Sequence, residues 1–93
     1  MGLPSGPSSG IIARAPRDVV LLDRAVQDLM AIPHVERRMI ATQLDGLATD
    51  ALPRGVEALG GRFRDHLRLR VGRFRLLYKV DDGLLTVVAL LAE

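Results

Sequence analysis

Apolar and basic residues alternate along two neighbouring segments in the second half of the chain. In His66–Val71 the leucines and the valine occupy every second position, and the basic residues lie between them. Arg73–Val80 repeats this pattern, with an apolar set and a set formed by Arg73, Arg75, Leu77 and Lys79. Side chains of a strand point alternately to opposite faces, so the pattern predicts two strands with one apolar and one basic face.

Two further strands are indicated by apolar runs. Leu84–Leu91 is apolar on both faces, which is typical of a strand in the middle of a sheet. The Asp81-Asp82-Gly83 sequence before it predicts a hairpin turn, and Gly72 predicts another between the two alternating strands. Asp18–Leu22 is short, apolar and β-branched, and we expect a buried strand there.

Helical periodicity occurs between the first strand and the alternating segments. Residues 24–32 form the first expected helix, with Asp23 as its N-cap and Pro33 as its end. Residues 34–47 form the second, with its apolar positions at helical spacing: Val35, Met39, Ile40, Leu44 and Leu47. Helices joined across one proline predict an antiparallel hairpin that covers one sheet face. Residues 52–61, rich in glycine and proline, predict a loop.

These elements predict an α+β fold of order β-α-α-β-β-β, with an antiparallel-rich sheet of about four strands. Residues 1–16 are dominated by glycine, proline and serine, and we interpret them as a flexible leader. Residues 17–93 then form one small domain.

The composition excludes several kinds of chemistry. There is no cysteine, which excludes disulfides and thiolate zinc sites. The two histidines, His34 and His66, have no acidic residues at metal-ligand spacing, and no phosphate-binding glycine loop is visible. We therefore expect no metal and no cofactor. The sequence has no apolar run long enough to span a membrane, which favours a cytoplasmic protein.

The charge is distributed unevenly. The net charge is only +2, yet seven of the thirteen basic residues lie between Arg62 and Lys79. They are Arg62, Arg64, Arg68, Arg70, Arg73, Arg75 and Lys79. Such a concentration on a strand pair suits an anion, and above all a phosphate backbone. An ordinary solvated sheet face is the alternative interpretation.

The segment Leu67–Gly83, read as LRLRVGRFRLLYKVDDG, resembles the RelE/ParE superfamily of bacterial toxins. Two shorter sequences support the resemblance, Leu29–Pro33 before the second helix and Glu57–Gly61 in the loop. The resemblance covers residues 18 to about 91. It implies the toxin of a type II toxin–antitoxin pair, bound by a cognate antitoxin.

The resemblance also implies an activity and its residues. RelE-type members are ribosome-dependent mRNA endonucleases, and by position Arg68, Arg70 and Arg75 match their catalytic basic residues. Arg62, Arg64, Arg73 and Lys79 would then contact nucleic acid. Fixed cations stabilise the charge that develops on a phosphate during cleavage.

One departure leaves the activity open. Where many members have a Gly-(His/Lys)-Arg sequence and then a tyrosine, this chain has Leu90-Leu91-Ala92-Glu93. Enzymatic activity is therefore one of three hypotheses. The others are a ParE-like inhibitor of DNA gyrase that cleaves nothing, and a degenerate toxin that only binds antitoxin.

Overall fold

A computed structural model describes residues 16–63 and 65–92. Residues 1–15 of the predicted leader, Arg64 and Glu93 lie outside the described residues. The elements in chain order are β1 (Asp18–Leu21), α1 (Asp23–Met30), α2 (His34–Thr49), β2 (Glu57–Ala58), a 3₁₀ turn (Gly61–Phe63), β3 (His66–Val71), β4 (Phe74–Asp81) and β5 (Leu84–Ala92). The predicted α+β class is confirmed, and so is the order of the six predicted elements, between which the structure adds β2 and the 3₁₀ turn.

The described strands form one sheet in the order β1-β5-β4-β3-β2. β1 pairs with β5 in parallel, and every other pairing is antiparallel. β5 is therefore an inner strand, as its apolar residues on both faces predicted. The prediction of about four strands missed β2, because a strand of two residues is too short to show an alternating pattern.

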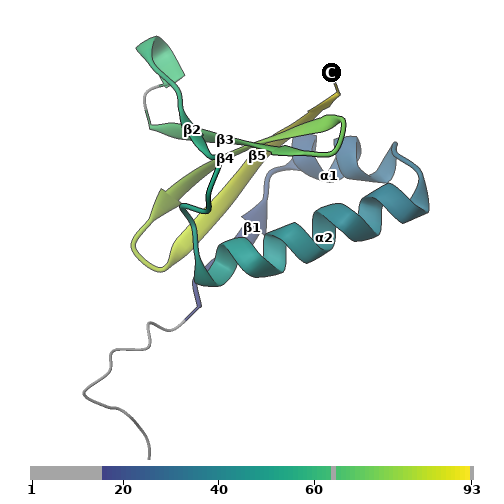
Figure 1. Cartoon of the computed structure of the whole chain (residues 1–93), viewed down its shortest axis with the longest axis horizontal. Coiled ribbons are helices and arrows are strands. Elements are labelled where there is room, and N and C mark those ends of the chain that lie inside the picture. The colour runs from purple at the N-terminus through teal and green to yellow at the C-terminus, as the bar shows by residue number, and fades with distance from the viewer. Residues whose placement is uncertain (1–15, 64, 93) are drawn as a thin grey trace, which may run out of the picture.

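Both helices pack on one face of the sheet (Figure 1). Ile40, Leu44 and Leu47 of α2 are buried against the strands, as predicted. Val35 and Met39 were expected to be buried with them, but they are 71% and 47% exposed. The reason is helical geometry: one residue advances the helix by about 100°, which places Met39 well to the side of Ile40.

The start of α1 also differs from the prediction. Leu22 occupies the N-cap position, and no side chain caps the helix. Asp23 is instead the first helical residue, where its negative charge favours the helix dipole. The end of α1 is held by Arg37 of α2, which donates hydrogen bonds to the Leu29 and Ile32 carbonyl oxygens at 3.2 and 3.1 Å.

Tyr78 lies at the centre of the core and is fully buried. Its hydroxyl donates a 2.7 Å hydrogen bond to the carbonyl oxygen of Ala51, two residues after the end of α2. Burial, with a smaller contribution from the negative charge of Asp50, raises the pKa of Tyr78 to about 12. The sequence placed Tyr78 on the apolar face, and the structure confirms this. The bond fixes the end of the helical hairpin to the middle of the sheet.

Candidate nucleic-acid interface

The face of the sheet opposite the helices contains most of the predicted basic residues. We call this surface the basic face, formed by His66, Arg68 and Arg70 of β3 and by Arg75, Leu77 and Lys79 of β4. Their strand neighbours Leu69, Leu76 and Tyr78 are buried under the helices. Since alternate residues of a strand point to opposite faces, the core on one side fixes these side chains on the other.

Arg70 and Arg75 lie together at the end of this face that is next to the β3–β4 turn. They are directly opposite each other in the β3–β4 register. Directly opposed residues of an antiparallel pair have Cβ atoms about 5 Å apart, so an anion above the sheet could contact both guanidinium groups. Arg70 also donates a long hydrogen bond, 3.4 Å, from Nε to the carbonyl oxygen of Gly72. The two strands thus bring together two of the three residues predicted to be catalytic.

Arg68, the third, is paired with a carboxylate from β2. Its Nε and Nη2 both donate to Oε1 of Glu57, at 3.1 and 2.9 Å. The two residues are opposite each other in the β2–β3 register, and the Glu57 side chain is 62% exposed. The sequence indicated only that Glu57 could form a salt bridge, because nothing in the loop pattern revealed the short strand that positions it. The structure therefore adds one acid to the basic face.

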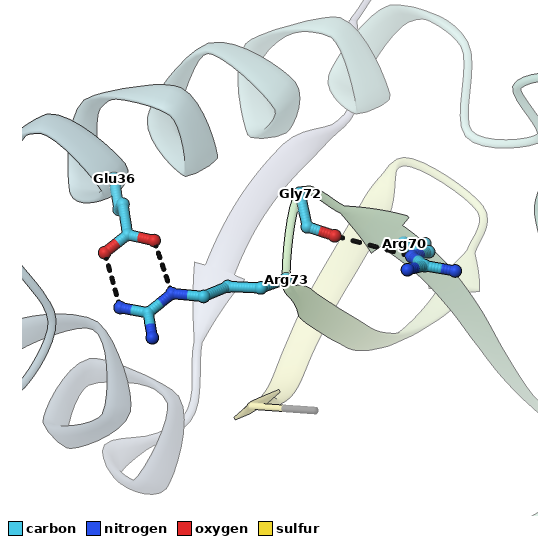
Figure 2. A network of polar contacts seen from close by, with 4 residues as sticks. All are labelled: Glu36, Arg70, Gly72 and Arg73. Atoms are coloured by element: carbon cyan, nitrogen blue, oxygen red, sulfur yellow. Dashed lines mark hydrogen bonds and ion pairs between the residues drawn. The ribbon is translucent and has the colours of Figure 1, made fainter.

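Arg73 does not lie on the basic face, contrary to the prediction. It precedes β4 in the tight turn with Gly72, whose φ of 60° favours glycine. Its side chain extends toward α2, where Nε and Nη2 donate to Glu36 at 2.6 and 2.7 Å, while Arg70 points elsewhere (Figure 2). The guanidinium carbon also lies 4.9 Å from the centre of the Phe74 ring. Arg73 therefore fastens the β3–β4 turn to the helical hairpin.

The pairing with Arg73 changes the acidity of Glu36. The hydrogen bonds from Arg73, together with its positive charge, hold the pKa of the Glu36 carboxyl below its usual value. A carboxylate bound in this way stays ionised at neutral pH and keeps its partner in place.

Two of the remaining predicted contact residues, Lys79 and Arg62, are described by the structure. Lys79 is exposed and is opposite His66 in the register. Arg62 is exposed on the 3₁₀ turn that leads toward β3. Arg64, predicted to extend the same surface, lies outside the described residues.

Other kinds of site have little support among the described residues. In residues 16–63 and 65–92, no three histidine, aspartate or glutamate side chains are grouped so that they could hold a metal ion. Neither helix is long and apolar enough to cross a membrane. The arrangement that remains is a fixed array of guanidinium groups with one carboxylate, which can bind a phosphate and stabilise charge that develops on it.

Solved structures of toxins share this fold. The RelBE2 toxin–antitoxin complex from Mycobacterium tuberculosis matches with a TM-score of 0.77 and 22% identity, over 85% of this chain and all of that one. The RelE–RelB complex from Pyrococcus horikoshii matches with a TM-score of 0.73 and 25% identity, over 84% and 96%. Isolated RelE from E. coli matches with a TM-score of 0.70 and 16% identity, over 84% of each chain.

No protein-family profile matches the sequence, and no curated protein matches it by sequence. The likeness is therefore one of three-dimensional structure. The protein has the RelE-type toxin fold, and the resemblance seen in Leu67–Gly83 is confirmed at that level.

Proposed function

We propose that this protein is the toxin of a type II toxin–antitoxin module and that it cleaves messenger RNA during translation. The observation that carries the proposal is the pairing of Arg70 with Arg75 in register on the basic face, next to the Glu57–Arg68 ion pair. The toxin fold supports it, because structures of YoeB from Staphylococcus aureus and YafQ from E. coli share it.

The chemistry follows from these side chains. Attack of an RNA 2′-oxygen on the neighbouring phosphorus forms a 2′,3′-cyclic phosphate and breaks the bond to the 5′-oxygen. Overall, the 5′-oxygen leaves as a hydroxyl with the proton that the 2′-hydroxyl loses. Negative charge builds on the phosphate oxygens during this step, and Arg70 and Arg75 stabilise it without a change in their own protonation. The 2′-hydroxyl must also lose its proton, which an arginine does not accept. Glu57 is the carboxylate that pairs with Arg68 on the same face, so we assign it the role of general base, with Arg68 holding it in position.

A cognate antitoxin is the proposed protein partner. The structures from M. tuberculosis, P. horikoshii and S. aureus that share the fold include complexes of a toxin with its antitoxin. An acidic segment of such a partner would be attracted to the basic face and would cover the same arginines that bind phosphate.

The test is cleavage of a defined mRNA by the purified protein on translating ribosomes, mapped by primer extension. Removal of one charge-stabilising group reduces catalysis by about 100-fold or more, so Arg75→Ala and Arg70→Ala should each lose at least this much. Glu57→Gln keeps an acceptor for Arg68 but not the base, and we expect a loss of about 100-fold. Arg38→Ala is the matched control, because Arg38 is an exposed arginine on α2. Arrest of translation while the mRNA stays intact would refute the proposed nuclease activity.

The helices favour a second candidate, a ParE-like protein that inhibits DNA gyrase by contact. Val26 and Met30 of α1 are spaced as i and i+4 and are 43% and 63% exposed; Val35 and Met39 of α2 have the same spacing and are also exposed. Exposed apolar groups of this kind indicate a protein contact. Inhibition of gyrase supercoiling by the purified protein, lost in Val35→Ser/Met39→Ser and retained in Arg75→Ala, would select this candidate.

A further inference from the structure

A groove of about 520 Å³ lies at the β4–β5 turn, and its volume is in the range of small-ligand sites. It is lined by Asp65, Lys79, Val80, Asp81, Leu84 and Thr86. Lys79 is opposite Thr86, and Asp81 is opposite Leu84, in the β4–β5 register. By strand alternation these four residues share the sheet face that holds Arg75, so the groove opens on the same side as the basic face.

The groove begins where the basic face ends. Lys79 belongs to both, and it lies four residues beyond Arg75 on β4, which is about 13 Å along a strand. An extended strand of nucleic acid that placed a phosphate at Arg70 and Arg75 would therefore continue over Lys79 and reach the groove.

The charges in the groove exclude a further phosphate. Asp65 and Asp81 contribute carboxylates, which repel phosphate oxygens, so the row of cations stops at Lys79. Leu84, 37% exposed, instead offers apolar surface on which a flat ring could lie. The carboxylates and the Thr86 hydroxyl supply hydrogen-bonding groups at its edge. This combination suits the uncharged part of a nucleotide, which is its base.

We propose that the groove binds one base of the RNA strand whose phosphates lie along the basic face, and that it prefers a base with an amino group. Carboxylates accept hydrogen bonds from the amino groups of cytosine, adenine and guanine. Uracil has no amino group, and its one donor on this edge, N3–H, lies between two carbonyl oxygens that a carboxylate repels. This inference rests on the proposed function, since it requires RNA on the basic face, and it adds a basis for choosing among RNA sequences.

The probes are fluorescein-labelled oligoribonucleotides of one length, one containing only cytosine and one only uracil. Fluorescence anisotropy with the purified protein gives the ratio of their affinities. We expect the cytosine strand to bind about fivefold more tightly, which corresponds to a single weak base contact. Asp65→Asn should abolish or reverse this ratio, since the new amide can donate to uracil. Asp82→Asn is the control: it makes the same change of charge in the adjacent turn, outside the groove.

Lys79→Gln separates phosphate contact from base contact. This substitution should weaken the binding of both oligonucleotides equally. It should also reduce the magnitude of the slope of log affinity against log salt concentration by about 0.7. Failure of the protein to bind either strand would refute RNA binding by the basic face, and the groove inference with it. Binding without a base preference, or with a preference that Asp65→Asn leaves unchanged, would refute the groove alone.

Discussion

The buried phenol of Tyr78 allows one prediction to be worked out in full. Tyr78→Phe keeps the ring and its packing but removes the 2.7 Å hydrogen bond to the Ala51 carbonyl. Both residues are buried, so water cannot replace the lost donor, and an unsatisfied carbonyl costs about 1–3 kcal/mol. Taking about 1.5 kcal/mol, and about 4–8 °C per kcal/mol for a domain of this size, the melting temperature should fall by about 6–12 °C.

The pH dependence of stability provides a control for the role of the Tyr78 phenol. Tyr78 is the single tyrosine of the chain, and there is no tryptophan, so tyrosinate absorbance reports its ionisation alone. Its pKa is raised to about 12 in the folded protein, against about 10 when unfolded. The protonated phenol therefore contributes stability below pH 10, and this contribution is lost as the pH rises through 12. The gap in melting temperature between wild type and Tyr78→Phe should narrow over that interval. Equal melting temperatures at neutral pH, or titration of the folded protein near pH 10, would refute the reasoning.

Two further predictions concern the helical hairpin. Glu36 has a lowered pKa in the folded protein, so its pairing with Arg73 contributes stability above the usual carboxyl pKa and loses it as the pH falls through the lowered value. Glu36→Gln should remove this acid-dependent part of stability, measured by urea unfolding between neutral and acidic pH; parallel curves for the two proteins would contradict it. Arg37→Ala should cost about 2 kcal/mol in the same assay, because it leaves two carbonyl oxygens at the end of α1 without their charged donor. Arg38→Ala, next to it and exposed, should cost little, and equal losses in the two variants would be inconsistent with the capping role.

Periodicity was sufficient to predict most of the fold. The alternation in His66–Val71 and Arg73–Val80 fixed which side chains face the core, and the run Leu84–Leu91 identified an inner strand. The same reasoning failed where the structure depends on contacts between distant segments. Arg73 continues the alternating pattern in sequence, but the turn at Gly72 frees it from the strand and Glu36 attracts it to the helices.

In the candidate site, too, local sequence patterns predicted some features, while others depend on contacts between distant segments. Arg70 and Arg75 could be placed on one face of paired strands from the alternating pattern, but their direct pairing is known only from the structure. Glu57 could not be placed, because a two-residue strand has no pattern and its position depends on pairing with β3. The groove at the β4–β5 turn could not be predicted from the sequence either. Its lining combines residues of both strands of the β4–β5 hairpin with Asp65, which precedes β3.

The parallel pairing of β1 with β5 has a consequence for the order of folding. The β3–β4 hairpin and its extension to β5 join neighbours along the chain, so they can form early and locally. β1 lies more than sixty residues before β5, with which it pairs, and closing so long a loop is slow because its entropy must be lost before the contacts form. During synthesis on the ribosome, β1 and both helices emerge before β5 exists. The nascent chain thus holds its helical hairpin before the sheet that it packs against is complete, and β1 can pair only after β5 has been made.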